Sequence, residues 1–127
     1  MKKLQNYING KFQPPVSGAY IENIDPSRGI PFSLIPDSGV DDVTQATEAA
    51  KNAFLIWSGM SLNQRSEILL KLSKGIEDRM DEFVTAESLD NGKPVSLARQ
   101  VDIPRAVSNL SFFATAVLHF ASESHYM

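Results

Sequence analysis

Residues 87–94 read Glu87-Ser88-Leu89-Asp90-Asn91-Gly92-Lys93-Pro94, and this stretch has the pattern of a helix end. Asn91 and Gly92 favour the left-handed conformation that closes a helix, and Pro94 prevents the helix from continuing. Lys93 lies where the helix dipole favours a cation. Asp90 places a negative charge at the same end, where the dipole disfavours it. A solvated carboxylate is the simplest interpretation of Asp90, and a ligand role is the alternative.

The residues before this stretch divide into strands and helices. Residues 1–37 read as strands and turns, and Asn9-Gly10 predicts a β-hairpin because both turn positions favour positive φ. Two further extended runs cover residues 20–24 and 31–35. Residues 38–127 read as helices, because their apolar residues recur at spacings of three and four. The sequence therefore predicts a β-hairpin region followed by four amphipathic helices.

The helix boundaries follow from capping signals. The Ser38/Asp41 and Ser61/Gln64 pairs have capping-box spacing, and Gly59 ends the first helix. A bend at residues 77–79 separates the second helix from a third that ends at Asn91, and a fourth begins at about Asp102. The adjacent acids Asp41-Asp42 and Asp81-Glu82 are expected to be solvated. The predicted inner faces contain Val43, Ala46, Ala50, Ala53, Phe54 and Trp57, then Ile68, Leu69, Leu72 and Ile76, then Ile103, Val107, Leu110, Ala114 and Val117.

Composition narrows the function classes. A net charge of −3 over 127 residues provides no basic surface for nucleic acid, and no apolar run is long enough to span a membrane. The start of the chain does not have the pattern of a signal peptide. The absence of cysteine excludes disulfides and thiolate metal sites, and a cytoplasmic location is the default expectation. His119 and His125 are six residues apart, which is not a same-face helical spacing, so a metal site there is disfavoured against ordinary surface histidines.

Several motifs together resemble the N-terminal region of the NAD(P)-dependent aldehyde dehydrogenase superfamily. They are residues 87–94 quoted above, Tyr7-Ile8-Asn9-Gly10-Lys11-Phe12, Asn23-Ile24-Asp25-Pro26-Ser27 and the run 46–57, in the family's order. The resemblance covers nearly the whole chain but only the first part of the family's domain. It implies an α/β aldehyde dehydrogenase fold in the full-length protein, whose coenzyme-binding domain would cover the helices of residues 38–127.

The family resemblance also implies the chemistry. The full enzyme would oxidise a small-molecule aldehyde to a carboxylic acid with NAD, as a homodimer or homotetramer, without nucleic-acid or membrane partners. Its cysteine nucleophile, oxyanion donor and base for water are needed for covalent catalysis. This chain contains no cysteine, and no Gly-rich phosphate loop follows a strand and opens a helix. No catalytic or coenzyme-binding residue is therefore assigned within residues 1–127.

Two binding roles are implied by matching positions. In relatives, an aspartate and two backbone carbonyls hold a structural monovalent cation, and the matching residues are Asp90, Asn23 and Ile24. Hard oxygen ligands fit such an ion. Binding of this cation is the alternative to the interpretation that Asp90 is a solvated carboxylate.

The last third resembles one branch of the family, the muconate semialdehyde dehydrogenases, through Asp102-Ile103-Pro104-Arg105. The resemblance implies 2-aminomuconate semialdehyde, from tryptophan catabolism, as substrate, and places Arg105 in the substrate tunnel. Pro104 suits only a first helical turn, so Arg105 is expected near a helix N-terminus, where the dipole disfavours a cation. Arg105 is thus a candidate for binding the substrate carboxylate, and a solvated arginine is the alternative.

Two functional hypotheses remain open. The first is the N-terminal part of an aldehyde dehydrogenase that is not catalytic by itself. The second is a stand-alone helical module that binds a partner through its apolar faces. A coding sequence that continues past Met127 would favour the first. The residues themselves do not distinguish an incomplete gene model from a genuine short product.

Overall fold

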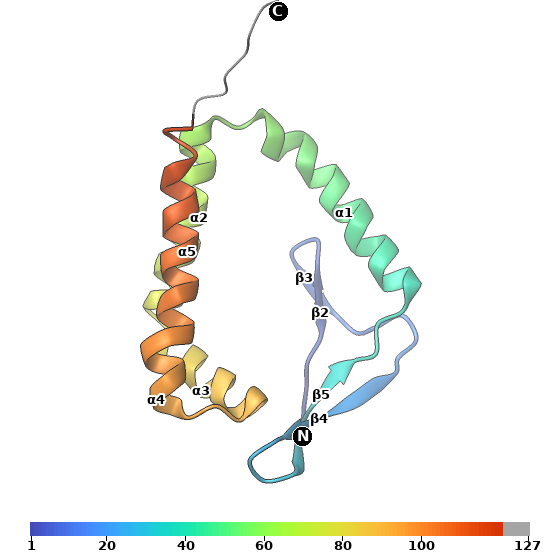
Figure 1. The fold of residues 1–127 in the computed structure, drawn as a ribbon. Coiled ribbons are helices and arrows are strands. Elements are labelled where there is room, and N and C mark those ends of the chain that lie inside the picture. Colours follow the sequence, from blue (N-terminus) through green and yellow to red (C-terminus); the bar gives the residue numbers. More distant parts are fainter. Residues whose placement is uncertain (121–127) are drawn as a thin grey trace, which may run out of the picture. The chain divides into compact units, whose positions relative to one another are not determined.

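In the computed structural model of the protein, residues 1–120 are described, and strands precede helices along the chain (Figure 1). The chain forms two compact units. Unit 1 contains residues 1–59 and 89–92, and unit 2 contains residues 60–88 and the chain from Lys93 onward. The strands lie within residues 1–37 and the helices follow, so the predicted strand-then-helix order is confirmed.

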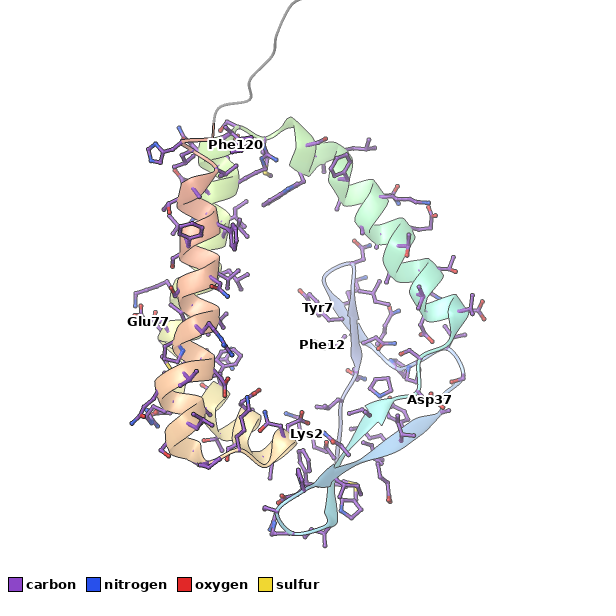
Figure 2. The ribbon with its side chains drawn as sticks, in the orientation of Figure 1. Lys2, Tyr7, Phe12, Asp37, Glu77 and Phe120 are labelled. Carbon is purple, nitrogen blue, oxygen red and sulfur yellow. The ribbon has the colours of Figure 1, made fainter. Side chains whose placement is uncertain are left out.

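The hairpin of unit 1 forms where the sequence predicts it. Strand β2 (Asn6–Ile8) pairs antiparallel with β3 (Lys11–Gln13). Asn9 and Gly10 between them have φ of 51° and 76°, the positive values that a two-residue hairpin turn requires. Tyr7 and Phe12 face each other across the strands with ring centroids 4.9 Å apart, and Figure 2 shows both rings on the hairpin.

The second sheet of unit 1 has the order β1-β5-β4. Strand β1 (Lys2–Lys3) is parallel to β5 (Ile30–Pro36), and β4 (Tyr20–Asp25) is antiparallel to it. Both longer strands match the predicted runs. The register shifts between Asn23 and Ile24, because Asn23 pairs with Ser33 whereas Ile24 pairs with Pro31. The extra residue of this β-bulge, Phe32, lies on β5, opposite the two residues that were predicted to supply carbonyl ligands.

Helix α1 (Val40–Gly59) ends at the predicted glycine, but its start corrects two expectations. Asp42 is only 3% exposed, so the prediction that it is solvated was wrong. Its carboxylate accepts hydrogen bonds from the backbone N–H of Gly39 and of Val16, both at 3.0 Å, and from Asn6 at 3.3 Å. The side-chain hydrogen bond at the start of α1 is therefore made by Asp42 and not by the predicted Ser38/Asp41 pair. These donors from distant segments offset the desolvation of the carboxylate.

In unit 2, α2 (Leu62–Glu77) begins with the predicted capping box of Ser61 and Gln64 and packs beside α5 (Ile103–Ala116) (Figure 1). The buried residues of α2 are Ser66 and Ser73, whereas Ile68 and Leu72, which were predicted to face inward, are 42% and 51% exposed. The Ser73 hydroxyl lies 2.9 Å from the carbonyl of Val107 on α5. Small side chains let two helix backbones approach closely, so α2 buries its serines, and not Ile68 and Leu72, where it packs beside α5.

Helix α3 (Met80–Asn91) starts after the predicted bend and ends at the predicted residue. Gly92 follows it with φ of 75°, the left-handed conformation expected of a helix-closing glycine. Val84 of α3 is fully buried and forms a small apolar cluster with Ala98 and Ile103 of the following helical segments. This cluster fixes the helical region that carries Arg105.

Candidate functional site

Two of the residues predicted to hold a cation, Asn23 and Asp90, are in contact in unit 1. The Asn23 side-chain amide donates a hydrogen bond to an Asp90 carboxylate oxygen at 2.7 Å, which joins the end of α3 to strand β4. Ser33, the partner of Asn23 across the bulge, is 3% exposed, and its hydroxyl has no hydrogen-bond partner. Asn23 thus contacts the Asp90 carboxylate through its side chain and pairs with Ser33 across the sheet.

The turn after β4 gives this contact a rigid frame. Asp25 is 2% exposed, and its carboxylate accepts from the Ser27 N–H at 2.8 Å and hydroxyl at 2.7 Å. Its other oxygen pairs with Arg28 at 2.6 Å. The hydrogen bonds from Ser27 and Arg28 lower the pKa of Asp25 to about 2. Asp25 is thus charged at neutral pH and satisfied within its own turn, which leaves Asp90 as the carboxylate available to the bulge.

Gly92 allows α3 to approach this turn. A Cβ on Gly92 would lie 3.1 Å from Cγ of Pro26, closer than side chains normally tolerate, and its positive φ is also unfavourable for other residues. A side chain at position 92 would push the end of α3 away from the turn. Gly92 is therefore needed both to close α3 and to allow the close approach to Pro26 that places Asp90 near Asn23.

Within residues 1–120, no group of three or more His, Cys, Asp or Glu side chains is placed to hold a metal ion. His119 is exposed after α5, and His125 lies outside the described residues. A cation held by Asp90 and the carbonyls of Asn23 and Ile24 would have hard neutral oxygens and one charge, which suits a singly charged ion.

Arg105 of unit 2 lies on a helical run that starts earlier than predicted. A single helical turn, α4 (Val95–Leu97), continues into a π-helix, η1 (Ala98–Asp102), and then into α5. The N–H of Ile103 is bonded to the carbonyl of Ala98, five residues back, so α5 has no free N-terminus. The α-helix α5 begins where it was expected, with Asp102 at the N-cap position and Pro104 in its first turn. The dipole argument for Arg105 was wrong, because the preceding helical turns continue into α5 and satisfy the N–H of Ile103.

Pro104 explains the π-helix. A proline inside an α-helix has no N–H for the preceding turn, and its ring clashes with the carbonyl four residues before it. The wider π turn relieves both problems, and such insertions are frequent at functional sites.

Arg105 is exposed and has an acidic neighbour on its own helix. Its side chain is 66% exposed, and Nη2 lies 3.3 Å from Oδ1 of Asp102, three residues before it. Asp102 is only 13% exposed, and its second oxygen, Oδ2, accepts from Lys93 Nζ at 2.9 Å. Lys93 also pairs with Glu87 at 3.6 Å. Hydrogen bonding to Asp102 raises the pKa of Lys93, so Lys93 is charged at neutral pH.

Sequence reasoning missed the roles of Asp102 and Lys93. Lys93 was interpreted as a helix-end cation, whereas its side chain bonds Asp102, nine residues on. The i,i+3 spacing of Asp102 and Arg105 was a usable signal, because residues at that spacing are neighbours on a helix surface. The pairing of Lys93 with Asp102 had no such signal, since it depends on how the chain turns at Pro94.

The start of α1 is unfavourable for binding a dinucleotide phosphate. The connection from β5 to α1 contains a single glycine, Gly39, and the carboxylate of Asp42 already accepts its N–H. Carboxylates at this helix start would repel a phosphate.

None of the described helices combines the length and the hydropathy needed to cross a bilayer.

A family model described as "Aldehyde dehydrogenase family" matches residues 12–126. The chain belongs to the aldehyde dehydrogenase family. The match includes the bulge between β4 and β5, the end of α3 and the helical run that carries Arg105. The family predicted from the Glu87–Pro94 stretch and its companion motifs is therefore confirmed, as is the α/β class of the fold.

Curated and solved relatives agree with the family. The chain is 48% identical over 124 residues to a 2-aminomuconic semialdehyde dehydrogenase of Danio rerio, covering 98% of this chain and 25% of that protein. It is 39% identical to a 2-hydroxymuconic semialdehyde dehydrogenase of Pseudomonas sp. (strain CF600), covering 100% and 26%. The structure of PnpE in complex with nicotinamide adenine dinucleotide matches with a TM-score of 0.86 at 35% identity, covering 88% and 23%.

The chain spans about a quarter of the length of the curated relatives it matches.

Proposed function

We propose that this chain is the N-terminal part of an NAD-dependent aldehyde dehydrogenase that oxidises 2-aminomuconate semialdehyde to 2-aminomuconate. In the overall reaction, the aldehyde and water give a carboxylate, and NAD accepts the hydride. Arg105 binds the carboxylate at the far end of the substrate and thereby orients the aldehyde. The chain itself is not catalytic. The whole enzyme forms a homodimer or homotetramer and is cytoplasmic.

The observation that carries this proposal is the exposed guanidinium of Arg105. At 66% exposure, with one 3.3 Å contact to Asp102, it retains donors for a second carboxylate. Arginine suits this role because its planar fork can bind a carboxylate through two parallel hydrogen bonds. The names of the relatives point to the same substrate class, since muconic semialdehydes carry a carboxylate away from the reacting aldehyde.

A chimeric enzyme tests the proposal. Residues 1–127 would replace the matching quarter of the Danio rerio relative, which supplies the rest of the fold. The chimera should reduce NAD with 2-aminomuconate semialdehyde at a higher kcat/KM than with an uncharged aldehyde of similar length. Equal kcat/KM for both aldehydes in a folded chimera would contradict the proposed substrate. A stable, monomeric 1–127 that captures a partner without any role in oxidation would favour the helical-module alternative.

We also propose that Asp90 and the carbonyls of Asn23 and Ile24 hold a structural monovalent cation. The ion would neutralise Asp90 and fasten the end of α3 to β4 at Asn23 and Ile24. The 2.7 Å bond between Asn23 and Asp90 and the unpaired buried hydroxyl of Ser33 support a polar site there. The cation would take no part in the reaction.

Asp90→Asn should weaken the stabilisation of the chimera by potassium or sodium, because it removes the charged ligand. Melting temperatures would be compared in KCl, NaCl and choline chloride at equal ionic strength, so that binding is separated from screening. Asp41→Asn is the matched control, since Asp41 is exposed at the start of α1. A Tm that depends on potassium or sodium equally in Asp90→Asn and in the parent would refute the cation site.

Gly92→Ala should destabilise the chimera by roughly 1–3 kcal/mol, because alanine at φ of 75° is strained and its Cβ would press on Pro26. Gly75→Ala is the matched control within α2, where a Cβ meets nothing within 4 Å. It should stabilise the helix by about 0.5–1 kcal/mol. Thermal or urea unfolding measures both changes. Shifts of the same sign for the two variants would show that Gly92 is not required for the helix end.

A further inference from the structure

Asp102 lies between two cations in unit 2. Its Oδ1 is 3.3 Å from Nη2 of Arg105, and its Oδ2 is 2.9 Å from Nζ of Lys93. The carboxylate is 13% exposed, whereas the Arg105 side chain is 66% exposed. The acid is therefore the fixed member of the Asp102–Arg105 pair, and the arginine is the member that reaches solvent.

The geometry restrains Arg105 without using up its hydrogen-bonding capacity. A guanidinium has five N–H donors, and the contact with Asp102 involves one nitrogen at a long distance. A bidentate pair would occupy the fork that a substrate carboxylate needs. The single contact instead fixes one edge of the guanidinium and leaves other donors for a ligand.

Lys93 explains why Asp102 does not neutralise Arg105. The shorter bond is made with Lys93, so a large part of the negative charge of Asp102 is already balanced there. Glu87 adds a second carboxylate near Lys93, at 3.6 Å. The η1 segment, with Pro104 after it, fixes Asp102 and Arg105 on adjacent turns. Arg105 thus keeps a net attraction for an anion.

We propose that Asp102, anchored by Lys93, is a positioning residue that holds the Arg105 guanidinium in the orientation that receives the substrate carboxylate. This inference rests on the proposed function of Arg105. Asp102 does not contact the substrate in this proposal, and it acts through the arginine alone. Its effect should therefore appear in the binding of acidic substrates and should disappear when Arg105 is absent.

Four versions of the chimera test this inference: the parent, Asp102→Asn, Arg105→Ala and the double variant. Asp102→Asn should raise KM for the acidic semialdehyde roughly three- to tenfold, with kcat changed less than about twofold. With an uncharged aldehyde of similar length, both constants should change less than about twofold. The double variant should be no worse than Arg105→Ala, because Asp102 acts through Arg105.

Two further variants separate positioning from general structure. Asp102→Glu keeps the charge and should recover part of the KM, and it serves as the test if Asp102→Asn does not fold. Asp81→Asn breaks an exposed ion pair with Arg99 in the same unit and should not change the KM. Additive losses, or equal losses with both aldehydes, would overturn the positioning role. If Arg105→Ala leaves KM for the acidic substrate unchanged, the proposed function of Arg105 fails. If Arg105→Ala raises that KM but Asp102→Asn does not, only the positioning role of Asp102 fails.

Discussion

Residues 1–127 by themselves should reduce no NAD with any aldehyde. The family's covalent chemistry needs a thiolate, and this chain contains no cysteine. At the start of α1, the N–H of Gly39 is already bonded to the carboxylate of Asp42 and is not available to a dinucleotide phosphate. The absorbance of reduced nicotinamide measures the result. Turnover above the buffer blank would contradict the assignment of the chain as a non-catalytic part of the enzyme.

The same polypeptide should self-associate or fold poorly. In the described residues, the buried apolar side chains are only Val84, Ala98, Ile103 and Ala114. Large apolar side chains of α1 and α5 are exposed by 62–76%, namely Phe54, Leu55, Ile56, Phe112 and Phe113. So small a core offsets little of the conformational entropy lost on folding, and exposed apolar surface drives association.

Light scattering and binding of a hydrophobic dye measure this association. Leu55→Glu and Phe112→Glu should each reduce it, because each places a charge among the exposed apolar residues. Glu48→Gln, at an exposed ion pair on α1, is the control and should leave it unchanged. A monomer with a sharp, cooperative thermal transition and no dye binding would instead favour an autonomous module.

The parts of the fold that could be predicted are those that local chemistry determines. Asn9-Gly10 forms its hairpin turn, Ser61 and Gln64 form their capping box, and Gly92 closes α3 with positive φ. In each case, a few adjacent residues favour one conformation strongly. Such signals need no knowledge of the rest of the chain.

The parts that could not be predicted depend on distant contacts. Asp42 is buried because donors from Asn6 and Val16 reach it, and nothing near Asp42 in the sequence reveals them. The buried face of α2 is polar because Ser73 meets the backbone of α5. Helical periodicity indicates that a helix forms, but the partner helix decides which face is covered.

The residues of the candidate site also differ in how far the sequence predicted them. Asn23 and Asp90 were assigned from the family resemblance, and the structure brings their side chains to 2.7 Å. Arg105 was assigned from the same resemblance, but the physical reason given for it, a helix N-terminus, was wrong because the π-helix η1 precedes α5. Pro104 was placed correctly in the first turn of α5, but the sequence did not reveal that α4 and η1 continue into that helix without a break.

Arg105→Ala should lower kcat/KM of the chimera for the acidic semialdehyde by about 1.5–3 kcal/mol, or roughly 10- to 150-fold. This is the range for losing a hydrogen bond to a charged group. The loss should be small with an uncharged aldehyde of similar length, because that substrate has no carboxylate for the guanidinium to bind. Steady-state kinetics with the two aldehydes measure the difference.

Two variants make the Arg105 test specific. Arg105→Lys keeps the charge but replaces the planar fork with a single ammonium, so it should recover only part of the loss. Arg79→Ala is the matched control, because Arg79 is 62% exposed and pairs with Glu82 at the same i,i+3 spacing that joins Arg105 to Asp102. It should leave the preference for the acidic substrate intact. If Arg105→Ala reduces kcat/KM equally for both aldehydes, Arg105 supports the fold and does not bind the substrate carboxylate.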